Sequence, residues 1–112
     1  MTTIYKQTHE RKRIPERLQA VLWSANIHHL DIKRDKGYIV HQVFAYGRME
    51  DIIWLLQVYT RDDLRKVFTT VPYKDYDRSR FYFIKNFILN LETVHLDERL
   101  YVRNIPRNIE QR

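Results

Sequence analysis

Glycine and proline are scarce in this sequence, and their scarcity limits the folds that the chain can adopt. Only two Gly and three Pro occur among 112 residues. Domains built from many short strands need frequent turns, and these two residues are among those that most often form them. The sequence therefore predicts a mostly α-helical protein. Its length suits one domain that can bury a core without disulfides.

Apolar residues recur at helical spacing in several stretches, which predicts a small bundle of about five helices. The expected helices cover residues 15–26, 31–47, 49–59, 60–71 and 79–91. The last of them has a broad apolar face for burial, made of Phe81, Ile84, Phe87, Ile88 and Leu91.

Residues suited to helix ends mark the bounds of these helices. Pro15 suits a first helical position, because its missing N–H has no partner there. Asp31 and Thr60 can each cap a helix with a side-chain oxygen. Gly47 follows an apolar stripe and is expected in the left-handed conformation that often ends a helix. Pro72 ends the fourth helix.

The two ends of the chain differ from the middle. We predict a basic arm over residues 1–14, a helical domain over 15–91 and an extended tail over 92–112. In the tail, Leu100 and Val102 alternate as in a strand. The tail is expected to pack either on its own domain or on a partner.

The net charge of +6 is concentrated at these ends. Residues 1–17 hold five basic and two acidic side chains, and residues 99–112 hold four basic and one acidic. Basic ends of this kind are compatible with nucleic acid, with an acidic protein partner, or with a role in solubility alone.

The absence of cysteine excludes disulfides, zinc–thiolate sites, iron–sulfur clusters and thiol nucleophiles. It also favours the cytoplasm, since small secreted domains often depend on disulfides. The N-terminus lacks the apolar core of a signal peptide, and no apolar run is long enough to span a membrane.

No catalytic, cofactor or metal site is expected. The chain has neither a Gly-rich phosphate loop nor a nucleophile elbow. His28, His29 and His41 do not follow a known metal-ligand spacing. Glu50 and Asp51 fall at the start of a predicted helix, where the helix dipole favours carboxylates without any chemistry.

The alternative function is that of a basic nucleic-acid-binding protein or an autoregulator of its own operon. Between residues 73 and 83, aromatic and cationic side chains alternate, a pattern that suits base stacking and phosphate pairing. Together with the basic arm, it gives five candidate contacts: Arg11, Lys12, Arg13, Arg78 and Arg80.

Residues 22–59 carry a pattern in which Tyr-Gly, Asp and Trp-Leu stand at fixed intervals. Its members here are Leu22, Trp23, Asp31, Ile39, Val43, Tyr46, Gly47, Asp51, Ile52, Trp54, Leu55, Leu56 and Tyr59. This pattern resembles a family of short bacterial proteins of unknown function, and the similarity extends to residues 61–70 and 79–91. Members are often encoded beside an abortive-infection nucleotidyltransferase toxin, so the resemblance implies an antitoxin or accessory partner.

The leading prediction is a non-enzymatic protein-interaction module, antitoxin-like, with a toxin as its possible partner. Basic tails with scattered apolar residues can dock on an acidic partner and become ordered on binding. The predicted partner contacts are Arg99, Leu100, Tyr101, Val102 and Arg103. A homodimer is a further alternative, suggested by aromatics expected at the surface, namely Tyr73, Tyr76 and Tyr82.

Overall fold

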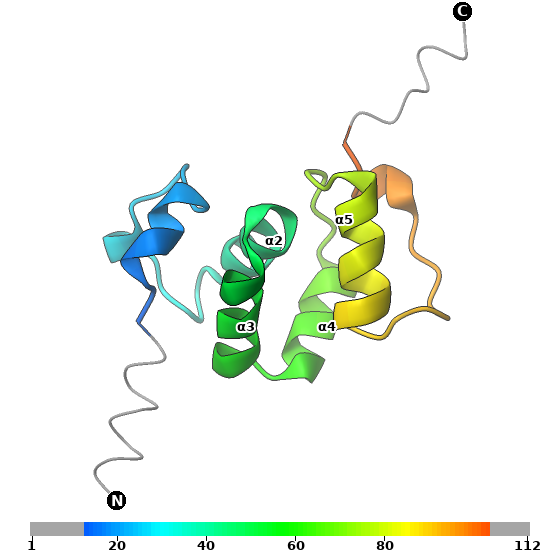
Figure 1. Ribbon diagram of the computed structural model, residues 1–112, viewed down its shortest axis with the longest axis horizontal. Helices are drawn as coiled ribbons and strands as arrows, with labels where there is room; N and C mark the ends of the chain where they lie inside the picture. The colour runs from blue at the N-terminus through cyan, green and yellow to red at the C-terminus, as the bar shows by residue number, and fades with distance from the viewer. Residues whose placement is uncertain (1–12, 104–112) are drawn as a thin grey trace, which may run out of the picture.

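The computed structural model describes residues 13–103, and within that range the protein is mostly helical. Four α-helices form its body, α2 (Lys36–Tyr46), α3 (Met49–Val58), α4 (Arg61–Thr70) and α5 (Arg78–Tyr82) (Figure 1). A π-helical turn (Phe83–Ile88) directly follows α5. Short 3-10 helices cover Glu16–Ala20, Ile27–His29 and Glu98–Leu100.

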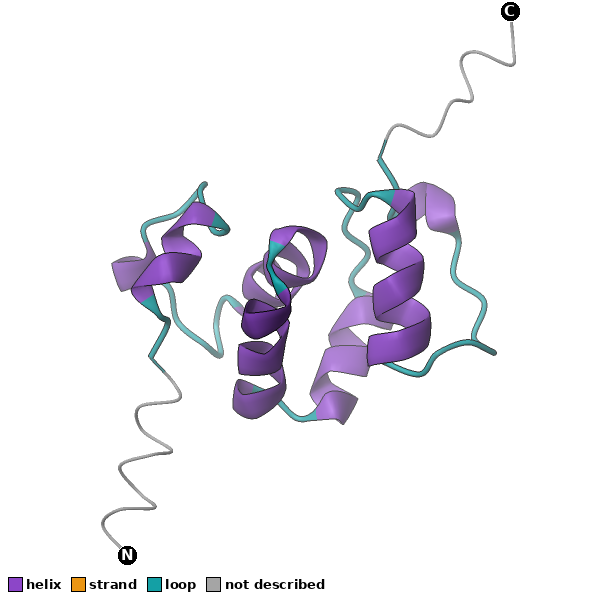
Figure 2. Ribbon diagram, in the orientation of Figure 1, coloured by secondary structure: helices purple, strands orange, loops and turns teal. Residues whose placement is uncertain are grey.

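The predicted fold class is confirmed, because the described residues form helices and loops and no strand (Figure 2). The predicted number of helices is too high by one. The helix expected over residues 15–26 is replaced by the first two 3-10 helices and the turns between them. None of the helices in residues 13–103 combines the length and apolar character required to cross a membrane.

The side chain of Gln19 explains why the first helix stops after one short element. Its amide nitrogen donates to the main-chain oxygens of Leu22 and Ala25, at 3.1 and 2.7 Å. Its amide oxygen accepts from the main-chain N–H of Ile27 at 3.1 Å. These bonds occupy main-chain groups that a continuing helix would use for its own hydrogen bonds.

Helix α2 is the central element, and it contacts α3, α4 and α5. The predicted apolar stripe of Ile39, Val40, Val43 and Phe44 is fully buried. Polar residues of the same helix are buried as well, including His41. A helix that is enclosed on nearly all sides belongs at the centre of a core.

An aromatic cluster lies where α2, α4 and α5 meet. The ring of Phe68 lies 5.8 Å from that of Phe81 and 5.2 Å from that of Tyr101, centroid to centroid. Phe81 is buried, as predicted. Tyr76 was expected at the surface, and this prediction is wrong: its ring is fully buried, 5.7 Å from Phe68.

Two of the predicted caps have different outcomes. Thr60 caps α4 as predicted, since its hydroxyl accepts from the main-chain N–H of Asp63 at 3.1 Å. Asp31 caps an earlier turn instead of α2: its carboxylate accepts from the N–H groups of Lys33 and Arg34, both at 2.8 Å. Helix α2 begins only at Lys36.

Gly47 ends α2, but not in the predicted left-handed conformation. Its φ is −74° and its ψ is 163°, which any residue can adopt. Glycine is required for space. A Cβ atom here would lie 2.7 Å from the main-chain oxygen of Val43 and 3.0 Å from the Cβ of Asp51.

The segment of residues 92–103, called here the C-terminal segment, packs on its own domain. An isolated parallel bridge joins Val102 to Tyr76, with the N–H of Tyr76 donating to Tyr101 and the N–H of Arg103 donating to Tyr76, both at 2.9 Å. Tyr101 and Val102 are buried. The expected strand-like alternation is absent, because Leu100 lies in a 3-10 helix.

Candidate functional site

The predicted partner contacts lie partly inside the core and partly at the surface. Tyr101 and Val102 are buried, and the hydroxyl of Tyr101 donates to the main-chain oxygen of Phe68 at 2.6 Å. Arg99 and Leu100 are exposed. Therefore only some of these side chains face solvent, while their neighbours hold the segment in place.

Arg103, the last predicted partner contact, is half-buried and points to α2. Its guanidinium donates to the hydroxyl of Tyr46 at 2.7 Å and lies 5.5 Å from the centre of that ring.

The predicted nucleic-acid contacts do not form one described cluster. Arg11 and Lys12 lie outside the described residues, and Arg13 is exposed. Arg78 donates to Glu98 at 2.9 Å. Arg80 points elsewhere, donating to the main-chain oxygens of Phe44 and Gly47 at 2.8 and 2.9 Å. Its charge therefore stabilises the C-terminal end of α2, where a cation complements the helix dipole.

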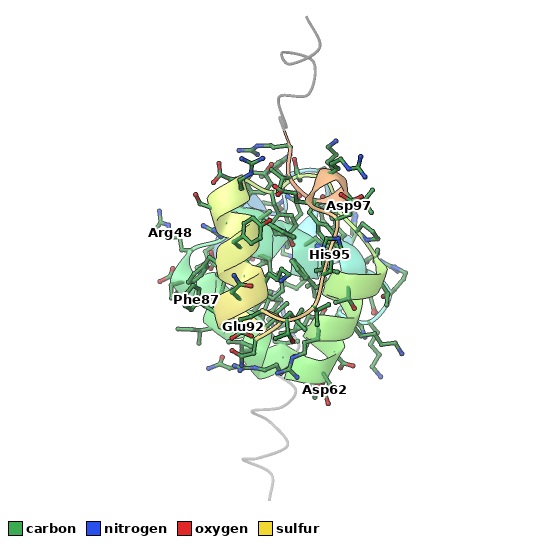
Figure 3. All side chains as sticks on the ribbon, turned by 90° about the vertical axis from the view of Figure 1, so that its right-hand side faces the viewer. Arg48, Asp62, Phe87, Glu92, His95 and Asp97 are labelled. Carbon is green, nitrogen blue, oxygen red and sulfur yellow. The ribbon has the colours of Figure 1, made fainter. Side chains whose placement is uncertain are left out.

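A groove of about 510 Å³ lies between α5, its π-helical turn and the C-terminal segment. Tyr82, Val94 and Leu96 give it apolar surface, and Glu92, His95 and Asp97 lie along the segment that crosses it (Figure 3). The groove thus combines an apolar interior with charged residues at its edges.

Hydrogen bonds fix the charged edge of this groove. Glu98 accepts from Arg78, and its second oxygen accepts from the hydroxyl of Tyr82 at 3.0 Å. Burial raises the pKa of Tyr82, and the nearby carboxylate of Glu98 raises it further. Asp97 accepts two hydrogen bonds from the side chain of Arg99, which lower its pKa.

Lys85 lies beneath the groove and is only 6% exposed. Its ammonium group donates to the main-chain oxygen of Leu91 at 2.8 Å, and the N–H of Leu91 donates back to the main-chain oxygen of Lys85 at 2.8 Å. These two hydrogen bonds between Lys85 and Leu91 stabilise the end of the π-helical turn.

The π-helical turn also moves Phe87 out of the core, against prediction. Each residue rotates less about the axis in a π-helix than in an α-helix, because the hydrogen bond spans five residues instead of four. The N–H of Leu89 accordingly donates to Ile84 at 2.9 Å. Leu89 is buried in consequence, and Phe87 is 74% exposed, on the side of α5 away from the C-terminal segment in Figure 3.

We use the name α5 surface for four exposed residues on or near α5, namely Tyr82, Phe87, Val94 and Leu100; of these, Tyr82 and Val94 line the groove. They are half of the eight large hydrophobic residues exposed in the described chain. Sequence reasoning found Leu100 but assigned Phe87 to the core, because apolar periodicity does not signal where a helix widens.

A second site surrounds the turn between α2 and α3. A hollow of about 310 Å³ is lined there by Arg17, Ala20, Val21, Tyr46, Arg48, Glu50 and Asp51. Asp51 is almost fully buried, and its carboxylate accepts from the N–H of Arg48 and from the side chain of Arg17, both at 2.9 Å. Sequence reasoning did not identify Arg17, which comes from a distant part of the chain.

None of the described residues forms a cluster of three or more His, Asp or Glu side chains suited to a metal ion. His41 lies in the core, where its ring contacts Tyr76 and Val71. His28 and His29 are exposed at the start of the domain.

Residues 18–68 match a family of unknown function (DUF6922). This range contains the Tyr46–Gly47 turn and Trp54, so it covers the core of the predicted resemblance to an uncharacterised family. No curated protein and no solved structure matches the chain.

Proposed function

We propose that this chain is a protein-interaction module without a catalytic site of its own, and that it serves as a cytoplasmic, antitoxin-like partner of a nucleotidyltransferase toxin. The α5 surface is the observation that carries the proposal. It offers Phe87, 74% exposed, and Leu100, 50% exposed, on a domain of modest size. Large apolar side chains left exposed on a small protein are candidates for a protein contact.

The groove beside α5 supports this use of the surface. An apolar side chain of a partner can enter between Tyr82, Val94 and Leu96, while Arg99 and Glu92 at the edges select its charged neighbours. Large apolar anchors in a pocket, ringed by polar residues, usually provide most of the affinity of a protein interface. The toxin as partner rests on the family resemblance in the sequence.

The test is calorimetric titration of the purified chain with a purified nucleotidyltransferase toxin from the same genome neighbourhood. We expect a complex, with Phe87→Asp and Leu100→Asp each weakening it about tenfold or more, as truncation of an interface anchor does. Met49→Asp is the matched control. Met49 is also an exposed apolar residue, but it begins α3, where a carboxylate suits the helix.

Each alternative result contradicts a defined part of the proposal. Absence of any complex at micromolar concentrations would contradict the toxin as partner. A complex that keeps its affinity in both the Phe87 and the Leu100 variants would remove the α5 surface as the contact.

A further inference from the structure

Arginine side chains from both ends of the described chain lie beside one residue, Tyr46. Arg17, in the basic N-terminal stretch, lines the hollow beside Tyr46. Arg103, in the basic C-terminal stretch, donates to the hydroxyl of Tyr46.

Two guanidinium groups in this region have no carboxylate within 4 Å among residues 13–103, those of Arg48 and Arg103. Arg48 is exposed, and Figure 3 shows it on the opposite side of the molecule from Asp97. Two acidic residues nearby are already paired, since Arg17 lies 2.9 Å from Asp51 and 3.5 Å from Glu50. Burial raises the pKa of the Tyr46 hydroxyl, and a third acidic residue, Asp75, lies close enough to raise it further.

An exposed aromatic ring lies next to these cations. Trp23 is 56% exposed and packs edge to face with Tyr46, with 4.8 Å between ring centres. Tyr46 is in turn held by Arg103. The indole is therefore fixed in position by its neighbour while much of its surface stays open to a ligand.

We propose that the Trp23–Tyr46 surface, made of Trp23, Tyr46, Arg48 and Arg103, binds single-stranded nucleic acid. A base stacks on the indole of Trp23, and the adjoining phosphates pair with Arg48 and Arg103. Aromatic platforms beside cations bind single strands in this way, and stacking does not depend on base identity. A duplex does not offer such a free base, because its bases are already stacked. This site is separate from the α5 surface and does not depend on it.

The test is fluorescence anisotropy of a labelled oligothymidylate of 12 nucleotides with the full chain at low and physiological salt. We expect Trp23→Ala to weaken binding about 5- to 100-fold, which corresponds to the loss of one stacked base. Trp23→Phe should retain most of the affinity, since the stacking face remains. Arg48→Ala should reduce the salt slope by about 0.7, the value for one lost phosphate contact.

Controls separate this site from general attraction between charges. Val71→Ala removes another exposed apolar residue, outside both proposed surfaces, and should leave the affinity unchanged. Circular dichroism of each variant verifies that its fold is intact. Equal binding by poly-glutamate, or binding of a duplex that does not respond to Trp23→Ala, would overturn the proposal. So would oligothymidylate binding that is unchanged in Trp23→Ala.

Discussion

The guanidinium of Arg17 lies 2.9 Å from a carboxylate oxygen of Asp51, which follows it by 34 positions in the sequence. Asp51 is 3% exposed, and its other oxygen accepts from the main-chain N–H of Arg48. One carboxylate thus starts α3 and also attaches the N-terminal 3-10 helix to it. This contact helps to position the short N-terminal elements, together with the hydrogen bond from Gln42 to the main-chain oxygen of Val21.

Removing the arginine should therefore destabilise the domain more than removing an ordinary surface cation. In Arg17→Ala, Asp51 keeps its main-chain partner but loses its charged one, and we expect a loss of about 1–3 kcal/mol in the free energy of unfolding. Arg99→Ala is the control, because that arginine pairs with Asp97 at an exposed site, where ion pairs contribute about 0–1 kcal/mol. Urea unfolding measures both. Equal losses would contradict a structural role for Arg17.

His41 should make the stability of the domain depend on pH. The main-chain oxygen of Val71 can only accept a hydrogen bond, so Nε2 of His41, at 2.6 Å, carries the proton. Nδ1 then accepts from the hydroxyl of Tyr76 at 2.7 Å. Burial lowers the pKa of His41 from 6.5 to about 4, although the hydrogen bond to Val71 opposes the shift.

The direction of this pH dependence follows from whether the folded or the unfolded chain binds the proton. Between about pH 6.5 and pH 4, the unfolded chain is protonated at this ring and the folded chain is not. Stability is complete above pH 6.5 and falls by about 3 kcal/mol as the pH drops to 4. Urea unfolding at a series of pH values measures this, and His41→Gln should flatten the profile. His95→Gln, at an exposed site, should leave the dependence of stability on pH unchanged.

Replacing each of the two glycines by alanine should change the stability of the fold in opposite directions. A Cβ at Gly47 meets the main-chain oxygen of Val43 at 2.7 Å, so Gly47→Ala should destabilise the fold by about 1–3 kcal/mol. Gly37 lies in the first turn of α2 with nothing within 4 Å of its added Cβ. Gly37→Ala should stabilise the fold by about 0.4–1 kcal/mol. Thermal denaturation of both variants tests this prediction. A Gly47→Ala variant more stable than the unsubstituted chain would contradict the close contact.

Substitution of two adjacent residues in the C-terminal segment should change the stability of the domain by very different amounts. The ring of Tyr101 lies 5.0 Å from that of Phe81 and 5.2 Å from that of Phe68, so Tyr101→Ala should lose about 3–5 kcal/mol. Leu100→Ala should change stability by less than about 0.5 kcal/mol, since its side chain is half exposed. Chemical denaturation compares them. Similar values for the two would mean that the segment does not complete the core.

Local signals predicted the central helices well. Helix α3 was expected over 49–59 and runs from Met49 to Val58, because its acidic first turn and its apolar face are both encoded within the helix. Helix α4 has its cap at Thr60 as expected. These features depend on neighbours a few positions away, which a sequence displays directly.

Contacts between distant residues set the features that the sequence did not reveal. The pairing of Arg17 with Asp51 and the bridge from Tyr76 to Val102 join segments with no local pattern in common. Phe87 is exposed because it lies in the π-helical turn, where the helix widens. For the candidate sites, sequence analysis identified Leu100 and Arg103 but not Trp23 or Arg48 as surface contacts.

The burial of Tyr101 and Val102 has a consequence for how the chain matures during synthesis. A nascent chain translated only as far as Leu91 already contains the sequences of all four α-helices, yet it lacks the two side chains that close the core beside Tyr76. Until the ribosome has released residue 102, Phe68 and Phe81 have no ring of Tyr101 to pack against. Completion of the fold must therefore wait for the last described residues, and a partner or chaperone can meet the earlier intermediate with its aromatic core still open.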